Sequence, residues 1–262
     1  MKHALGTHGK AALLQCARQG ALLAFDFDGT LAPIVADPHR AALRPETHQL
    51  LVHLSRQQPC LVLSGRGPQD LASRLGGISL VELVGNHGAS FGLGPAARAA
   101  AIARSARWRV QLTEQLAGRT GLQIEDQGVS LAVHFRRTPD RTAARRAIRR
   151  AVDALPGACA LDGKCVVNVL PVAFANKGMV LRSIARERRV TSALFVGDDV
   201  TDEAAFRADV APRYMTVRVG RSTGSAAGYF LNNQSEIDEL LHTLLRLPSS
   251  PRSTLRRARQ VP

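Results

Sequence analysis

The sequence predicts an α/β fold: a doubly wound, mostly parallel sheet with a smaller α+β unit inserted into it. Three apolar runs end abruptly in polar residues, which is typical of parallel strands buried on both faces. Between the second and third of these runs, the stretch 94–170 alternates helical and strand-like patterns. We therefore expect a core that carries functional groups at its strand ends, and a second unit, which we call the cap.

The first apolar run, residues 21–25, ends in two carboxylates, Asp26 and Asp28. An unpaired charge at the end of a buried strand costs roughly several kcal/mol unless a cation compensates it. Residues two apart in an extended chain project to the same side. The pair therefore predicts a metal ion, although a solvated strand end with an Asp-Gly turn is the alternative.

The other two strand ends carry groups suited to phosphate and metal. Residues 59–63 run into Ser64, and residues 193–196 run into Gly197 and then Asp198. Between them, Lys177 opens a stretch with helical spacing of apolar residues. A lysine at the amino end of a helix adds its charge to the partial positive charge of the helix, which favours a bound anion.

The order of these signatures resembles the haloacid dehalogenase superfamily of phosphoryl-transfer enzymes. The four are the DxDGT motif at Asp26, Ser64, Lys177 and the GDDxTDE motif at Gly197. Within that superfamily, four segments resemble the trehalose-6-phosphate phosphatases. These segments are 85–89, 133–136, 163–167 and 197–206. The resemblance extends over roughly residues 20–232 and implies the fold predicted above.

The resemblance implies a role for each catalytic side chain. Asp26 would be the nucleophile that forms an aspartyl-phosphate, and Asp28 would protonate the departing oxygen and then activate water. Ser64 and Lys177 would hold the charge of the phosphoryl oxygens. One Mg²⁺ would bind between Asp26, the backbone carbonyl of Asp28 and Asp198. The implied activity is hydrolysis of trehalose 6-phosphate to trehalose and phosphate, the last step of trehalose biosynthesis.

The resemblance also implies a set of substrate-binding residues from the core and the cap. They are Asp26, Phe27, Asp28, Ser64, Gly65, Arg66, His87, His134, Arg136, Lys164 and Asn168. For His87 a loop imidazole that caps backbone is the alternative, and for His134 a polar cross-strand pair. Asp199 and Asp202 are expected to orient Lys177 or to contact the metal ligands from the outer shell. The alternative that one of them binds the metal directly stays open.

The sequence departs from the family pattern at positions that would read the sugar. The family usually has Glu after His-Gly-Ala and Glu in the strand after Gly-Lys, where this chain has Ser90 and Asn168. Leu170 stands where a basic residue is common. A capped phosphatase for another sugar phosphate, such as a sucrose or mannosylglycerate phosphate, is therefore an alternative. A phosphomutase is a further one, since it would share the two carboxylates but must protect its phosphoenzyme from water.

We expect a core at 1–93 and 171–246, a cap at 94–170 and a disordered basic tail at 247–262. Inside the cap, the pattern predicts helices over 100–116 and 141–155, and strands over 121–126 and 130–136. A hairpin follows, with strands at 158–161 and 164–170 and a two-residue Asp162-Gly163 turn. That register would pair Leu161 with Lys164, Ala160 with Cys165 and Cys159 with Val166.

Charge and cysteine usage narrow the partners. The formal net charge is +14, but the arginines lack the interleaved aromatic residues that stack on bases. We expect solvated helix faces that attract anionic sugar phosphates, and no nucleic acid as the primary partner. The four isolated cysteines fit reduced thiols, and no apolar segment is long enough for a membrane span or an export signal. The prediction is a cytoplasmic monomer.

Overall fold

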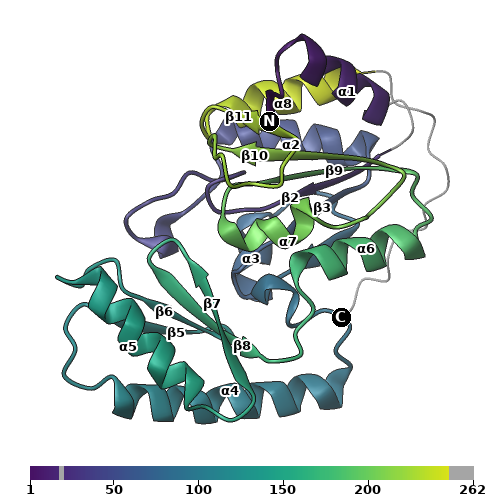
Figure 1. The fold of residues 1–262 in the computed structure, drawn as a ribbon. Helices are drawn as coiled ribbons and strands as arrows, with labels where there is room; N and C mark the ends of the chain where they lie inside the picture. Colours follow the sequence, from purple (N-terminus) through teal and green to yellow (C-terminus); the bar gives the residue numbers. More distant parts are fainter. Residues whose placement is uncertain (18–20, 248–262) are drawn as a thin grey trace.

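The computed structural model describes residues 1–17 and 21–247, and it contains two sheets (Figure 1). The larger sheet has seven strands, all paired in parallel, and the smaller sheet has four antiparallel strands. The predicted doubly wound sheet with an inserted α+β cap is therefore confirmed. The predicted basic tail, except Leu247, lies outside the described residues.

The core contributes most of the regular elements. Its strands are β1 (Lys2–His3), β2 (Leu22–Phe25), β3 (Cys60–Leu63), β4 (Glu82–Val84), β9 (Ser192–Gly197), β10 (Arg213–Val219) and β11 (Tyr229–Leu231). Its helices are α1 (Thr7–Ala17), α2 (Pro45–Gln57), α3 (Pro68–Arg74), α6 (Lys177–Glu187), α7 (Glu203–Phe206) and α8 (Glu236–Arg246). Short 3₁₀ turns occur at Pro38–Arg40, Asn86–Gly88 and Val200–Asp202.

The strand order explains where a ligand can bind. Across the large sheet the order is β1-β11-β10-β9-β2-β3-β4. From β2 the chain adds β3 and β4 on one side, and after the cap it adds β9, β10 and β11 on the other. In such sheets the crevice outside the carboxyl ends of the strands, at the point where the order reverses, is the usual ligand site. That point lies between β2 and β9.

Both faces of the large sheet are buried, which accounts for the continuous apolar runs. Leu23 and Phe25 of β2 pack into the cluster that contains apolar residues of α1, α2 and α8. The alternate residues Leu22 and Ala24 pack into the cluster that contains residues of α6 and α7. Successive strand residues face opposite sides of the sheet. The helices α1, α2 and α8 therefore cover one face, and α6 and α7 cover the other (Figure 1).

The cap has its own apolar cluster. It consists of α4 (Pro95–Gln115), β5 (Gln123–Asp126), β6 (Leu131–His134), α5 (Arg141–Asp153), β7 (Ala158–Gly163) and β8 (Val166–Pro171). Val133 of β6 and Val167 of β8 pair in the sheet and pack with Trp108 of α4 and Ile148 of α5. One face of the cap sheet is thus covered by two helices, so its other face is left for the pocket.

The turn of the β7–β8 hairpin differs from the prediction. Gly163 pairs with Val166 and Cys159 pairs with Leu170, so the two turn residues are Lys164 and Cys165. The predicted pairs of Leu161 with Lys164, Ala160 with Cys165 and Cys159 with Val166 are therefore wrong. The turn lies two residues further along the chain and each pairing partner shifts by four, an even number that leaves the alternation of the faces unchanged.

A tertiary contact explains why the Asp162-Gly163 signal does not mark the turn. Gly163 lies in β7 against the core, where an added Cβ would meet Asp199 Oδ2 at 3.2 Å and Val166 Cγ1 at 2.9 Å. The glycine therefore permits a close approach of cap and core. The positive φ of the turn falls on Cys165, at 59°.

All four cysteines lie in the described ranges, and none of them is in a disulfide. Among the helices that the structure describes, none combines the length and apolar character that a membrane span requires.

We predict that Leu112→Ala lowers the free energy of unfolding of the cap by about 2–5 kcal/mol, because Leu112 is fully buried in α4. Val110→Ala on the same helix should change it by less than about 0.5 kcal/mol, because Val110 is 56% exposed. Trp108 is the only tryptophan in the chain and lies in the cap cluster, so its fluorescence during urea unfolding reports this unit. Equal destabilisation by the two substitutions would contradict the packing.

Candidate active site

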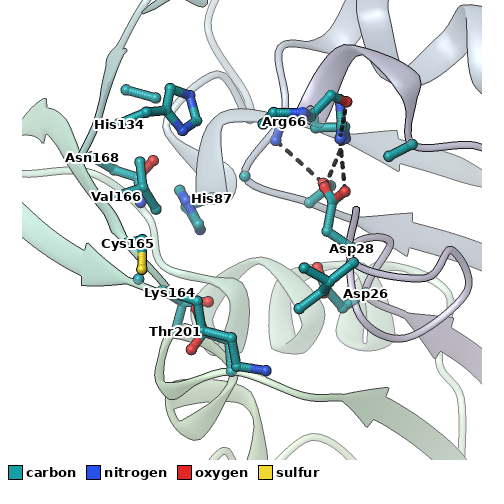
Figure 2. A pocket seen from close by; sticks show the side chains of 18 of the residues that line it. Asp26, Asp28, Arg66, His87, His134, Lys164, Cys165, Val166, Asn168 and Thr201 are labelled. Carbon is teal, nitrogen blue, oxygen red and sulfur yellow. Dashed lines mark hydrogen bonds and ion pairs between the residues drawn. The ribbon is translucent and has the colours of Figure 1, made fainter. Parts of the chain in front are cut away.

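A pocket lies between the carboxyl ends of β2, β3 and β9 and the open face of the cap sheet (Figure 2). The core lines it with the groups at its strand ends and with a loop at residues 34–41. The cap lines it with residues of β5, β6 and β8 and with the β7–β8 turn. All twelve of the predicted site residues other than Phe27 line this pocket: Asp26, Asp28, Ser64, Gly65, Arg66, His87, His134, Arg136, Lys164, Asn168, Lys177 and Asp198.

A buried ion cluster forms the floor. The ammonium of Lys177, at the start of α6, donates to Asp26 Oδ1 at 2.7 Å and to Asp202 Oδ1 at 2.6 Å. Burial alone would lower the pKa of Lys177, but Asp202 and Asp26 raise it above its ordinary value. Burial raises the pKa of Asp26, and the nearby carboxylates Asp202 and Asp198 add to this while Lys177 opposes it. One buried ammonium thus stands among three buried carboxylates.

The remaining negative charge fits a hard cation. Carboxylate oxygens of Asp26, Asp198 and Asp202 lie within 4.8 Å of one another, and all three residues are buried. The Asp198 carboxylate also lies against the backbone after Asp28, because a Cβ on Gly29 would come within 2.3 Å of Asp198 Oδ2. An all-oxygen donor set suits Mg²⁺ better than zinc. The residues present therefore fit the predicted metal.

Asp202 has other partners that explain its position. Its Oδ1 accepts from Lys177, and its Oδ2 accepts from the backbone amides of Asp198 at 2.8 Å and Asp199 at 3.0 Å. Both oxygens are thus engaged in holding Lys177 and the turn after β9. Among the described residues, the Asp198 carboxylate accepts a hydrogen bond only from Lys164 of the cap turn, which donates to its Oδ2 at 2.5 Å. Burial raises the pKa of Asp198 to about 6, although Lys164 lowers it.

The turn after β3 is shaped for an anion. Ser64 is buried, and its Oγ accepts from the backbone amide of Arg66 at 3.2 Å. Gly65 lies directly under the ring of His87, where a Cβ would come within 2.5 Å of His87 Nε2. Only glycine permits this approach, which leaves the backbone of the turn open toward the pocket.

Asp28 lies beside this floor but is not part of the ion cluster. Its carboxylate accepts two hydrogen bonds from Arg66, both 2.7 Å long, from Nε and Nη2 (Figure 2). Its side chain is 39% exposed, whereas that of Asp26 is 7% exposed. One carboxylate of the DxD pair is therefore buried with Lys177 and the other faces the open pocket.

The cap contributes polar groups on one face of its sheet. Glu125 pairs with Ala132, which pairs with Asn168, so these positions share a face. On the same face Glu125 Oε2 lies 2.7 Å from Nε2 of His134. Asn168 Nδ2 donates to the carbonyl of Leu161 at 3.3 Å. This face can offer both donors and acceptors to sugar hydroxyls.

His87 joins the core to the cap. It has a φ of 53°, is 7% exposed and is in polar contact with the side chain of Asn168. Burial first, and then the charge of Lys177, lower the pKa of His87 to about 3, so the ring is neutral. Its Nδ1 is buried and has no hydrogen-bond partner among the described residues.

One predicted substrate-binding residue and two of the departures from the family pattern do not line the pocket. The side chain of Phe27 is fully buried in the core, so only its backbone can face a substrate. Ser90 is buried, and its hydroxyl donates to the carbonyl of Gly85 at 3.4 Å. Leu170 is fully buried in a small cluster under the cap, which also includes Ala101. Of the three departures from the family pattern, only Asn168 lines the pocket.

Sequence reasoning missed several lining residues. They include Glu125, Gln127 and Thr201, together with the apolar Ile34 and Val35 of the core loop. A signal for Glu125 was present: the strand over 121–126 pairs with the strand of His134, and alternation then puts Glu125 on the face of His134. Ile34 and Val35 lie in a loop, for which the sequence has no periodicity to place the side chains.

The sequence profile of the trehalose-phosphatase family matches residues 24–235. Curated trehalose-phosphate phosphatases of Mycobacterium marinum and Mycobacterium tuberculosis are 31% and 30% identical over 74% and 88% of this chain. A probable trehalose-phosphate phosphatase of Sinorhizobium fredii is 32% identical over 76% of this chain and 77% of its own length. The chain spans only 53% and 62% of the two mycobacterial relatives.

Solved structures agree in fold. The C-terminal domain of Candida albicans trehalose-6-phosphate phosphatase superposes with a TM-score of 0.77 at 22% identity, covering 95% of this chain and 99% of that one. The sucrose-phosphatase of Synechocystis superposes with a TM-score of 0.53 at 16% identity, covering 86% of this chain and 98% of that one. From the extent of the profile match and these relatives, we conclude that the chain belongs to the trehalose-phosphatase family.

Proposed function

We propose that this protein is a Mg²⁺-dependent phosphatase that hydrolyses trehalose 6-phosphate to trehalose and phosphate through an aspartyl-phosphate. This would be the last step of trehalose biosynthesis. The observation that carries the proposal is the buried cluster of Lys177 with Asp26, which opens under a polar cap face. Membership in the family supports the choice of substrate. The cytoplasmic location and the monomeric state of the protein stay predictions.

In the first half-reaction, Asp26 attacks phosphorus in line with the sugar oxygen. The bond from phosphorus to the sugar oxygen breaks as the bond to Asp26 forms, and the sugar oxygen takes a proton from Asp28. Lys177 holds Asp26 Oδ1, so the second oxygen of that carboxylate is the one available for attack. The products are the free sugar and phosphorylated Asp26.

In the second half-reaction, Asp28 accepts a proton from a water molecule that attacks the same phosphorus. Phosphate leaves, and the Asp26 carboxylate and protonated Asp28 are restored. Throughout, Lys177, the Ser64 hydroxyl and the amide of Gly65 stabilise charge on the phosphoryl oxygens. Asp26, Asp198 and the carbonyl of Asp28 would hold Mg²⁺, which supplies further charge stabilisation and orientation of the phosphoryl group.

A second candidate substrate rests on Asn168. In the family pattern a Glu is usual there, and a carboxylate can accept hydrogen bonds from two sugar hydroxyls at once, whereas an amide offers one acceptor and one donor. Asn168 is 4% exposed and lines the pocket, so its amide would contact the sugar where a carboxylate is usual. Another sugar phosphate, such as a sucrose or mannosylglycerate phosphate, is therefore the alternative substrate. A phosphomutase would be distinguished from a phosphatase by its product, an isomeric sugar phosphate in place of free phosphate.

We predict that Asp26→Asn and Asp28→Asn each lower turnover by at least about a hundredfold. Asp26→Asn should form no phosphoenzyme because it lacks the carboxylate nucleophile. Asp28→Asn should accumulate phosphoenzyme from an aryl phosphate, because that leaving group needs no proton while water activation is lost. Acid-quenched labelling with ³²P-phosphate substrate measures this, and circular dichroism controls for folding. Full activity in a folded Asp26→Asn variant would refute the nucleophile.

We predict that EDTA abolishes activity and that Mg²⁺ restores it. Asp198→Ala should raise the Mg²⁺ concentration needed for half-maximal activity by about tenfold or more, because a buried carboxylate ligand is lost. Asp209→Ala is the control, because Asp209 is exposed and does not line the pocket, and its requirement should stay within about threefold of the wild type. Phosphate release at graded Mg²⁺ concentrations measures both. Activity that persists in metal-free protein would contradict the site.

The substrate is tested with trehalose 6-phosphate, sucrose 6-phosphate and glucose 6-phosphate. We expect trehalose 6-phosphate to give the highest kcat/KM, and Asn168→Glu to leave that value unchanged or raise it by up to about tenfold through an added acceptor. If another sugar phosphate is the substrate, the same substitution should lower its kcat/KM, because a buried charge replaces a fitted amide. A wild-type enzyme that hydrolyses only another sugar phosphate would overturn the named substrate.

A further inference from the structure

Arg66 makes a two-pronged contact with Asp28. Its Nε donates to Asp28 Oδ2 and its Nη2 donates to Asp28 Oδ1, each at 2.7 Å. This parallel geometry is the strongest and most directional that a guanidinium and a carboxylate can adopt. It defines the plane of the Asp28 carboxylate, because both oxygens are held at once.

The guanidinium is itself held from its other edges. Nη1 donates to Asp70 Oδ2 at 2.9 Å, and Nη2 also donates to the carbonyl of Pro38 at 2.8 Å. Arg74 in turn binds both oxygens of Asp70, and the ring of Phe27 lies 5.4 Å from Cζ of Arg66. The Arg66 side chain is only 10% exposed. Its position is therefore determined by the core and not by a ligand.

These contacts leave little capacity for a phosphate. An arginine has five N–H donors, and Arg66 uses four of them on Asp28, Asp70 and Pro38. Binding a phosphate with two donors would require it to release at least one of these three partners. In the part of the chain that the structure describes, Arg66 is also the source of every side-chain hydrogen bond to the Asp28 carboxylate.

We propose that Arg66 is a positioning residue that orients Asp28 for its two proton transfers, in place of the substrate contact expected from the sequence. Proton transfer needs the carboxyl oxygen within hydrogen-bond reach of the sugar oxygen or of water, and a displacement near 1 Å costs on the order of a hundredfold in rate. Each Asp28 oxygen keeps a second acceptor site beside the Arg66 bond. The inference rests on the proposed function, which assigns the acid/base role to Asp28.

The test uses Arg66→Lys, which keeps the charge but loses the fork, and Arg66→Met, which loses both. Arg44→Lys and Arg44→Met are matched controls, because Arg44 pairs with Asp238 at 2.7 Å and does not line the pocket. The substrates are trehalose 6-phosphate and p-nitrophenyl phosphate, measured in the steady state and in the first turnover. The aryl leaving group departs without a proton, so its first release does not depend on Asp28.

We expect Arg66→Met to slow the first turnover of trehalose 6-phosphate by about tenfold or more, while the first release of p-nitrophenol falls by less than about threefold. Steady-state turnover of the aryl phosphate should then fall about tenfold and phosphoenzyme should accumulate, because water activation is impaired. Inhibition by inorganic phosphate should be unchanged. Arg66→Lys should show the same pattern, and the Arg44 variants should match the wild type.

Two results would overturn the inference. Equal losses in the first turnover of both substrates would mean that Arg66 only supports the fold, and weaker inhibition by inorganic phosphate would mean that it binds the phosphoryl group. The aryl phosphate does not depend on the sugar. If the wild-type enzyme does not hydrolyse trehalose 6-phosphate, but Arg66→Met shows the expected changes with the aryl phosphate, the proposed substrate is refuted while the role of Arg66 is supported.

Discussion

The buried ammonium of Lys177 is the interaction on which the site depends. It is 2% exposed and lies between Asp26 and Asp202, so each charge is tolerated only because the others are present. Removal of one partner from such a buried cluster costs about 3–5 kcal/mol, since an uncompensated charge remains. The cluster joins the ends of β2 and β9 to the start of α6. It therefore holds together the point where the strand order of the sheet reverses.

The sequence predicted this part of the molecule well, because each signal is local. Strands buried on both faces are apolar throughout, so Asp26, Ser64 and Asp198 stand out at the points where the strands end. Parallel strands end at the same edge, which brings these residues together without knowledge of the register. Lys177 could be assigned to the same site because a lysine at the amino end of a helix adds to the partial positive charge there, which favours a bound anion.

The details that sequence reasoning missed depend on contacts between distant segments. The Asp162-Gly163 pair has the local signature of a turn, yet Gly163 is needed where the hairpin meets Asp199 of the core. Likewise, Arg66 follows Ser64 in a motif that suggests phosphate binding, and only the folded chain shows its fork on Asp28. A local sequence pattern cannot decide whether such a side chain contacts the substrate or holds another residue of the site.

Under the proposed function, the chemistry and the recognition of the sugar rest on different parts of the structure. The floor groups come from the core, whereas Glu125 and His134 belong to the cap sheet. The two parts meet at His87, which lies over Gly65 and contacts Asn168. Because the imidazole is neutral, a change from carboxylate to amide at position 168 leaves no buried charge unpaired beside it. If the cap recognises the sugar as proposed, that recognition can thus diverge while the ion cluster below keeps its charge balance.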